Sequence, residues 1–451
     1  MLFSPRLTRR SRTYQRPLLW LLAVAFVIDA LRTIGSRGST VRLDPASSST
    51  IKKPSVFIVS VHRNTEEILR SAWNENLLKL VDYLGHGNVY VSAVESGSQD
   101  HTKEALLDLK ESLTARGVDH TIELGTTVWE QLDELNAWPE PGTPMAERPG
   151  WIWHAEEEHF ALRRIPYLAR VRNQAMAPLL QIQRQRQKTF DYVLWINDVA
   201  FDTADVMTLL KTRGGHFAAA CAMDFKAYPY YYDTFALRDI NGDKAVSDQW
   251  PWFRSADART DVKAGRSVRV QSCWNGMIAF DAQPFYDKKK QQGSKQGSKQ
   301  GMKTADPLLF RGVEDSLAEF HLEGSECCLI HADNPLSRFG DAIPESGSEN
   351  ENVGVWLNPN VRVAYSAPVY EQVRRASLFP GAFSAVRGIW ANRWERARSS
   401  IQFMLESQTV LNRLRRWRSE TPEGAPPRSE PGAVCLINEM QIMWQNGWKH
   451  L

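Results

Sequence analysis

Short apolar runs alternate with amphipathic stretches along the first half of the chain. A continuous apolar run bounded by turn-forming residues predicts a buried strand, and an apolar pattern with a helical period predicts a helix. On this basis we predict strands at residues 56–61, 88–94, 120–124, 192–196, 217–223, 272–280 and 327–331. We predict helices at residues 65–84, 100–116 and 167–186. This alternation predicts an α/β fold in which helices cover both faces of a mostly parallel sheet.

Two segments interrupt this pattern inside the predicted domain at residues 54–370. Residues 136–160 are rich in Pro, Trp and Glu, which predicts a long surface loop. Residues 288–303 (KKKQQGSKQGSKQGMK) contain a tandem GSKQ repeat, which predicts a disordered insertion.

The composition changes again near residue 371. Residues 374–418 have the pattern of a basic amphipathic helix, and residues 421–432 resemble a Pro/Glu-rich linker. We therefore expect residues 371–451 to form a C-terminal tail appended to the core.

The N-terminus has the pattern expected of a membrane-targeting segment. Residues 18–28 (LLWLLAVAFVI) are an unbroken apolar run, and the five arginines of residues 1–16 precede it without an acid. The positive-inside rule then predicts a cytosolic basic tail (1–16), a signal-anchor helix (17–34) and a stem (35–53). A cleaved secretory signal and a buried helix are the alternatives.

The composition narrows the class of protein further. Hydrophobic residues make up 43% and charged residues 24% of the chain, as in ordinary globular proteins. The net charge of +3 is the sum of basic terminal segments and an acidic core. The acidic core argues against nucleic-acid binding, because a nucleic-acid-binding domain carries its positive charge on its folded surface. A lumenal domain could form one or two disulfides among five cysteines, but the sequence does not pair them: Cys221, Cys273, Cys327, Cys328 and Cys435.

Polar residues at the carboxyl ends of the predicted strands are candidates for the site, because ligands of such sheets bind there. Asn197 and Asp198 directly follow the strand at residues 192–196. A carboxylate in this place can hold a divalent cation, since hard cations prefer oxygen ligands. A turn or helix cap is the alternative.

A second strand end, at residues 95–100, has the sequence ESGSQD before a predicted helix. The helix N-terminus favours an anion, and a simple N-cap is the alternative. Arg172 could pair with a phosphate or an internal carboxylate, or lie on a solvated helix face. Trp274 next to Asn275 would suit a sugar ring, although most tryptophans belong to the core.

Acidic residues and a histidine near residue 320 are further candidates. Glu314 and Asp315 could orient an acceptor hydroxyl or assist proton transfer. His331 ends an apolar run and could bind a metal through a neutral imidazole, or simply be hydrogen-bonded.

Taken in order, these segments resemble the fungal α-1,3-mannosyltransferase and capsule-associated protein family, glycosyltransferase family 69. The resemblance covers residues 54 to about 370 and extends more distantly to the fungal Golgi mannosyltransferases of family 62. It rests on blocks such as SVHRN (60–64), ESGSQDHT (95–102), YLARVRNQAMAPL (167–179), FDYVLWINDVAF (190–201), SCWNGMIAFDAQPF (272–285) and FRGVEDSLAEFHL (310–322).

The resemblance implies a GT-A type nucleotide-sugar-binding fold on a single-pass type II membrane protein of the Golgi or endoplasmic reticulum. It also implies GDP-mannose as donor, a divalent cation such as Mn²⁺, and retention of the α configuration. Asp198 and His331 would be metal ligands. The residues expected around the nucleotide sugar are His62, Glu95, Ser96, Asp100, Arg172, Asn173, Asn197 and Asp224.

The sequence departs from the fold's usual acidic motif. GT-A enzymes typically carry Asp-x-Asp, whereas this chain has Asn197-Asp198-Val199. Asparagine keeps an oxygen ligand but loses the charge, so metal dependence stays open.

The function implied by the resemblance is transfer of mannose to a mannose-containing glycan during cell-wall or capsule polysaccharide synthesis, with an α-1,3 linkage. Catalytic roles are expected for Asp198, Glu314 and Asp315, and acceptor contacts for Trp274 and Asn275. Asp224 and Asp233 are also conceivable nucleophiles. Expected partners include the membrane, through the N-terminal helix, and other glycosyltransferases.

Two other functions stay open. A lumenal glycan-binding or assembly protein could keep the fold without turnover. A transferase that uses another nucleotide sugar is the second.

Overall fold

The computed structural model describes residues 17, 19–31, 53–125, 127–287, 306–337, 339, 354–375, 381–445 and 447–451. The predicted cytosolic tail, nearly all of the predicted stem and the lysine-rich insertion at 288–303 lie outside these described residues. Residues 19–31 are helical. Among the helices that are described, none combines the length and the apolar character needed to cross a membrane.

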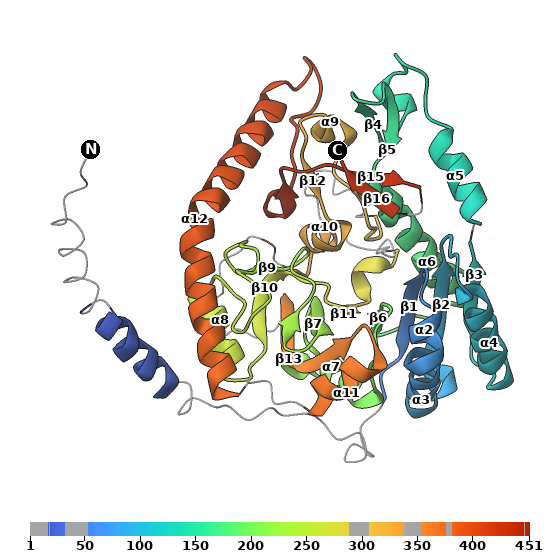
Figure 1. Ribbon diagram of the computed structural model, residues 1–451. Helices are drawn as coiled ribbons and strands as arrows, with labels where there is room; N and C mark the ends of the chain where they lie inside the picture. The colour runs from blue at the N-terminus through green and yellow to red at the C-terminus, as the bar shows by residue number, and fades with distance from the viewer. Residues whose placement is uncertain are drawn as a thin grey trace, which may run out of the picture.

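Within the described residues, ten strands form one large sheet (Figure 1). They are β1 (Val56–His62), β2 (Val89–Glu95), β3 (His120–Leu124), β6 (Tyr192–Ile196), β7 (Ala219–Ala227), β8 (Tyr230–Tyr231), β9 (Arg238–Asp239), β10 (Val268–Ser272), β11 (Met277–Asp281) and β13 (Val355–Ala364). Their order is β3-β2-β1-β6-β11-β7-β13-β10-β9, and β8 pairs with β7.

Most of these strands run in one direction. β1, β2, β3 and β6 are mutually parallel, and β7 and β13 are parallel to each other. β11 lies antiparallel between β6 and β7, while β10 and β8 also oppose the common direction. The predicted mixed α/β fold with a mostly parallel sheet is therefore confirmed.

Helices cover both faces of this sheet. The helices of the described residues are α2 (Glu66–Ile68), a π-helical turn (Leu69–Trp73), α3 (Asn74–Leu84), α4 (Thr102–Ala115), α5 (Val128–Asn136), α6 (Arg164–Arg186), α7 (Thr203–Leu210), α8 (Ala256–Lys263), α9 (Asp315–Ala318), α10 (Glu326–Asp333), α11 (Ala367–Arg375) and α12 (Ala382–Ser419). α3, α4 and α7 pack with Val56 and Ile58 of β1 on one face. α6 packs with Phe57 and Val59 on the other. Because successive residues of a strand point to opposite faces, the continuous apolar run of β1 supplies both cores.

The prediction of a single strand at residues 272–280 is wrong. β10 ends at Ser272 and β11 begins at Met277. The turn between them holds Asn275 (φ 56°) and Gly276 (φ 75°), both in the left-handed region. The turn residues are as buried as the strands they join, so hydrophobicity does not reveal the break.

The prediction of a strand at residues 327–331 is also wrong, because helix α10 occupies this segment. The Ser325 hydroxyl accepts a hydrogen bond from the Cys327 N–H at 3.2 Å and caps the helix. A short apolar run does not distinguish a buried strand from a buried helix. Ser325, two residues before the run, is the signal that favours the helix.

Residues 136–160, predicted as a surface loop, contain regular structure. β4 (Trp151–His154) pairs with β5 (His159–Leu162) as an antiparallel hairpin. This hairpin leads directly into α6 and lies at the upper end of the molecule in Figure 1.

The C-terminal segment packs against the rest of the chain instead of projecting from it. β14 (Leu436–Ile437) pairs with β12 (Glu323–Gly324), and β15 (Gln441–Trp444) forms a hairpin with β16 (Gly447–His450). A third apolar cluster contains side chains from β4, β5, α9, α10, α12, β14 and β15. α12 runs along one side of the molecule (Figure 1). The sequence did not indicate this packing, because the contacts join segments far apart in the chain.

All five cysteines are described, and four of them form two disulfides. Cys221 pairs with Cys273, and Cys328 pairs with Cys435. Cys327 is buried and not disulfide-bonded. The second disulfide ties the C-terminal segment to α10.

Candidate active site

The loop after β6 brings Asp198 to the wall of a cavity. The Asn197 N–H donates to the Gly276 carbonyl at 2.9 Å, and the Trp73 indole N–H donates to the Asn197 carbonyl at 2.9 Å. These bonds fix the loop backbone beside a cavity of about 130 Å³. The cavity is lined by Asn64, Thr65, Glu67, Ile68, Ser71, Asp198, Tyr365 and Ser366.

The Asp198 carboxyl group is half-buried, and burial raises its pKa. Across the part of the chain that the structure describes, no ion pair with a basic side chain is recorded for it. A carboxylate partly withdrawn from water without a countercharge gains stability from an added cation.

Gly276 joins the elements that surround this carboxylate. A Cβ atom there would lie 3.0 Å from Val199 Cγ1, 3.0 Å from Val363 Cγ2 and 3.1 Å from Asp224 Cβ. Its φ of 75° also disfavours any other residue. The glycine therefore lets the β6 loop, β13 and β7 approach one another closely.

Asp224, near the end of β7, forms a buried acidic pair with Asp233. Asp224 accepts hydrogen bonds from the Tyr365 hydroxyl at 2.7 Å and from the Asp233 N–H at 3.1 Å. Asp233 accepts a hydrogen bond from the Asn275 N–H at 3.2 Å. Burial, with the neighbouring charge of Asp233, raises the pKa of Asp224 to about 7, and burial also raises the pKa of Asp233. Such a pair can hold or release a proton near neutral pH.

Arg172 adds a cation beside these carboxylates. Its Nε donates to Glu326 Oε1 at 3.0 Å, and its charge interacts with Asp233. Its guanidinium lies 4.4 Å from the ring centroid of Trp274 and 5.3 Å from that of Trp195. Arg172 is thus not on a solvated helix face but in the interior next to the acidic pair.

The predicted acceptor residues are less open than expected. Trp274 is only 3% exposed, and the guanidinium of Arg172 covers its ring. Asn275 is fully buried, and no hydrogen bond of its Nδ2 is recorded with the described residues. Trp274 therefore packs in the core, whereas Asn275 belongs to the acidic cluster through its backbone.

His62 and Glu95 face each other across β1 and β2 and are fully buried. The His62 ring packs edge-on against Trp73 at 4.9 Å, and burial lowers its pKa to about 3, so it is neutral at physiological pH. Glu95 Oε1 accepts a hydrogen bond from the Ser98 N–H at 2.5 Å, and its Oε2 lies 3.4 Å from Lys103 Nζ. Glu95 thereby shapes the turn after β2.

Three other predicted nucleotide-binding residues make contacts within the fold. Asp100 accepts hydrogen bonds from the Thr102 hydroxyl at 2.6 Å and the Glu66 N–H at 3.0 Å, so it caps helix starts. The amide of Asn173 donates to the Phe310 carbonyl at 2.8 Å. The Ser96 and Tyr167 hydroxyls are 3.0 Å apart.

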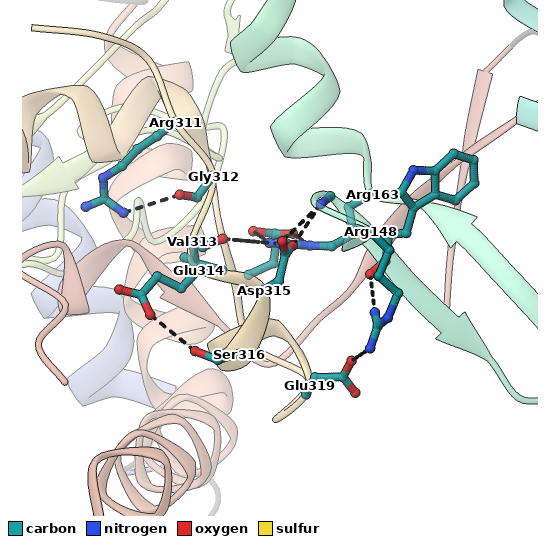
Figure 2. A network of polar contacts seen from close by, with 12 residues as sticks. Arg148, Arg163, Arg311, Gly312, Val313, Glu314, Asp315, Ser316 and Glu319 are labelled. Atoms are coloured by element: carbon teal, nitrogen blue, oxygen red, sulfur yellow. Dashed lines mark hydrogen bonds and ion pairs between the residues drawn. The ribbon is translucent and has the colours of Figure 1, made fainter. Parts of the chain in front are cut away.

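Glu314 and Asp315 belong to a different network, at the start of α9 (Figure 2). Asp315 lies 2.6 Å from Nη1 of the buried Arg163 and accepts the Gly150 N–H at 3.0 Å. Arg163 also pairs with the buried Glu323 at 2.8 Å. Glu314 is exposed and accepts a hydrogen bond from the Ser316 hydroxyl. The structure does not bring these two acids to the Asp198–Asp224 cluster; Asp315 instead joins α9 to the β4–β5 hairpin.

His331 likewise lies apart from Asp198. It sits on α10, where its Nε2 is 2.8 Å from the Cys273 carbonyl and its ring stacks on Phe280 at 5.6 Å. Burial lowers its pKa to about 4. The hydrogen-bonded alternative is therefore what the geometry shows. The sequence misplaced His331 because the segment is a helix and not a strand end.

The described residues were compared with the needs of a cation site made wholly of protein ligands. In the described part of the chain, no three His, Cys, Asp or Glu side chains are grouped so that they could hold a metal ion. A single carboxylate such as Asp198 fits a different arrangement, in which substrate phosphates supply most of the ligands.

The sequence analysis gave two residues of this cluster, Tyr365 and Glu326, no role in the site. Tyr365 follows directly after β13, so the strand-end rule would have identified it if that strand had been predicted. Glu326 opens α10, which was taken for a strand. Asp233 was considered only as a conceivable nucleophile.

Comparison with known protein families shows that the chain matches one of them. The family described as cryptococcal mannosyltransferase 1 matches residues 55–333. Its boundaries enclose Asp198, Asp224, Asp233 and Arg172, and exclude Tyr365. Among curated protein sequences, none matches the chain.

Several solved structures are similar to the chain. The mannosyltransferase PcManGT from Pyrobaculum calidifontis, in complex with GDP-Man and Mn²⁺, has 12% identity and a TM-score of 0.34, covering 92% of this chain and 86% of that one. TarS 1–349 from S. aureus has 10% identity and a TM-score of 0.32, covering 81% and 82%. The mannosyltransferase Ktr4p from S. cerevisiae has 11% identity and a TM-score of 0.25, covering 58% and 66%.

Proposed function

The chain belongs to the family of cryptococcal mannosyltransferase 1, and from that premise we propose that it transfers mannose from GDP-mannose to a mannose-containing glycan. The proposal includes an α-1,3 linkage, retention of the α configuration, a GT-A type fold, and a role in cell-wall or capsule polysaccharide synthesis.

The observation that carries the proposal is the convergence of charged groups at one edge of the sheet. Asp198, the Asp224–Asp233 pair and Arg172 come from three strand ends and a helix. Tyr365 connects them, because it lines the cavity with Asp198 and donates to Asp224. A sugar diphosphate needs such a mixture of acidic and basic groups, because it carries negative phosphates next to an electrophilic carbon.

On the donor side, Asp198 would hold a divalent cation together with the diphosphate oxygens. When bound, this cation would stabilise the charge that develops on the leaving GDP. Arg172 lies beside the acidic cluster, where its charge interacts with Asp233, and it would orient the donor through charge. Its bond to Glu326 keeps the guanidinium in place.

On the reacting side, Asp224 and Asp233 would act on the transferred sugar or the acceptor hydroxyl. Because the pKa of Asp224 is raised to about 7, it can accept or donate a proton at physiological pH. Retention would follow from attack by one of these carboxylates on the anomeric carbon, or from same-face attack guided by the leaving phosphate.

We also propose that the chain resides in the Golgi or endoplasmic reticulum membrane with its catalytic domain in the lumen. The basic residues before the apolar run at 18–28 support this orientation. Two disulfides within the fold support an oxidising compartment.

A donor panel tests the proposed function. The purified full-length chain is incubated with an α-mannoside, Mn²⁺ and GDP-mannose, GDP-glucose, UDP-glucose or UDP-galactose in turn, and the products are identified by mass spectrometry. We expect a mannosylated product with GDP-mannose alone. Transfer from a UDP-sugar, or donor binding without any product, would point to one of the two other functions.

A further inference from the structure

A second cavity lies away from the Asp198–Asp224 cluster, between α5, β5 and the C-terminal β15–β16 hairpin. Its volume is about 210 Å³. Residues from three distant parts of the chain line it: Leu132, Leu135, Asn136, Trp138, Glu157, His159, Ala161, Leu162, Ile442, Met443, Trp444 and Gln445. We call this the hairpin cavity.

An exposed indole forms part of its wall. Trp138 has 42% of its surface exposed, although one ring face stacks on His159 with ring centroids 4.3 Å apart and planes 12° apart. Stacking on one face holds the indole rigid and leaves apolar area in contact with water. A flat, fixed and exposed aromatic surface favours a ligand that presents polarised C–H groups, as a pyranose ring does.

Side-chain amides stand beside this indole. Asn136 and Gln445 are exposed, and within the described residues no hydrogen bond of their side chains is recorded. Each amide offers two donors and one acceptor, which is the complement of sugar hydroxyls. An apolar ligand would leave these amides unused.

The charges around the hairpin cavity argue against an anionic ligand. Lys449 is 2.6 Å from Glu157 and lies over the Trp444 ring, so its charge is already compensated. His159 also pairs with Glu157, at 3.0 Å. What is left for a ligand is an apolar lining with an indole face and neutral amides, which suits an uncharged polyhydroxylated ring with an apolar C–H face.

Helix α6 relates the hairpin cavity to the acidic cluster. Leu162 of β5 lines the cavity, and Arg172 lies on α6 eight residues after the first helical residue, Arg164, roughly 12 Å along the helix at a rise of 1.5 Å per residue. Arg164 lies between them and donates to Gln441 of β15 at 2.6 Å. A single sugar cannot occupy both places, but an extended glycan could contact both.

We propose that the hairpin cavity binds a hexose residue of the acceptor glycan that lies several sugars away from the one receiving mannose. This inference rests on the proposed glycosyl transfer. The C-terminal β15–β16 hairpin, which lies outside the residues matched by the family, would then contribute to acceptor binding.

Acceptor kinetics with the full-length chain test the proposal. A linear mannose oligosaccharide and a single-mannose glycoside are compared as acceptors for Trp138→Ala. We expect the KM for the oligosaccharide to rise about three- to ten-fold, the loss expected for one aromatic contact. The KM for the single-mannose glycoside, the KM for GDP-mannose and kcat should stay within about two-fold.

Trp129→Ala is the matched control, because Trp129 is 76% exposed on α5 and does not line the cavity. Gln445→Ala, at an exposed position, gives a second test that does not threaten folding, and it should raise the oligosaccharide KM in the same way. Unchanged KM values in both variants, or an equal effect from Trp129→Ala, would overturn the proposal.

Calorimetry separates this inference from the proposed function. The chain is titrated with the mannose oligosaccharide in the absence of donor. Binding that Trp138→Ala weakens by about three- to ten-fold supports the site even if the chain transfers no mannose. Transfer by the wild-type chain together with binding that is insensitive to Trp138→Ala would leave the proposed function intact and refute the hairpin cavity as a glycan site.

Discussion

The hydroxyl of Tyr365 donates a 2.7 Å hydrogen bond to the buried carboxyl group of Asp224. Tyr365 also lines the cavity that contains Asp198. One side chain therefore links the two acidic groups on which the proposed chemistry depends, although they follow different strands.

The titration of Asp224 predicts how stability depends on pH. Burial, with the neighbouring Asp233, raises its pKa from 3.8 to about 7. The folded protein then keeps a proton that the unfolded chain releases, so this contribution to stability is full below pH 3.8 and is lost as the pH rises towards 7. Asparagine does not titrate, so Asp224→Asn should remove the loss.

Urea denaturation at pH 5 and pH 8 measures this effect. From pH 5 to pH 8, the wild-type protein should lose about 1–3 kcal/mol more unfolding free energy than the Asp224→Asn variant does. Parallel pH dependences of the two proteins would show that Asp224 is already ionised at pH 5.

Gly276 should be more sensitive to substitution than its backbone angle alone implies. Gly276→Ala meets three side-chain atoms within 3.1 Å, whereas Gly117, which also has a positive φ of 65°, has open space where a Cβ would be. We expect thermal unfolding to show a loss of about 1 kcal/mol for Gly117→Ala and about 3 kcal/mol or more for Gly276→Ala. Equal losses would mean that backbone strain, and not the close approach of β6, β7 and β13, decides the outcome.

Arg172 should require a planar guanidinium and not only a positive charge. Its Nε binds Glu326 while its plane faces Trp274. We expect Arg172→Lys to lower kcat/KM for GDP-mannose by about 100-fold, because lysine cannot stack and bond in this way. Arg170→Lys, on the exposed side of the same helix and paired with Glu134, should change it less than about two-fold. Similar effects of the two substitutions would remove Arg172 from the site.

Asp315 should matter for folding and not for turnover. Asp315→Asn weakens its ion pair with the buried Arg163, so we expect a loss of about 2–4 kcal/mol in unfolding free energy. The kcat of the folded fraction should stay within about three-fold of wild type. A large fall in kcat at unchanged stability would instead restore the catalytic role that the sequence suggested for Asp315.

The part of the fold that could be predicted is the part with local signals. β1, β2 and β6 are mainly apolar runs, and each lies close to its predicted bounds. The shorter and more polar β3 (HTIEL) also has its predicted bounds. Asp198 and Arg172 could be identified because polar residues at strand ends and on a neighbouring helix are brought together by the topology of such a sheet.

What could not be predicted depends on long-range packing. Nothing local to Asp315 indicates that Arg163, far away in the sequence, will bind it. The turn at Gly276 could not be predicted because its residues are as buried as the strands beside it. Helix α10 was missed because a short apolar run fits a strand equally well. The hairpin that carries Gln445 comes to β5 through contacts that no sequence period encodes.

The central claim is that Asp198 acts on the donor. The most direct test is to measure kcat of the full-length Asp198→Asn variant with GDP-mannose, Mn²⁺ and an α-mannoside. Asp202→Asn is the control, because Asp202 caps α7 and asparagine can replace it as a cap. We predict that kcat falls about 100-fold or more for Asp198→Asn, with an unchanged unfolding temperature, and stays near wild type for Asp202→Asn. A kcat for Asp198→Asn within a few-fold of wild type would contradict the assignment of the site.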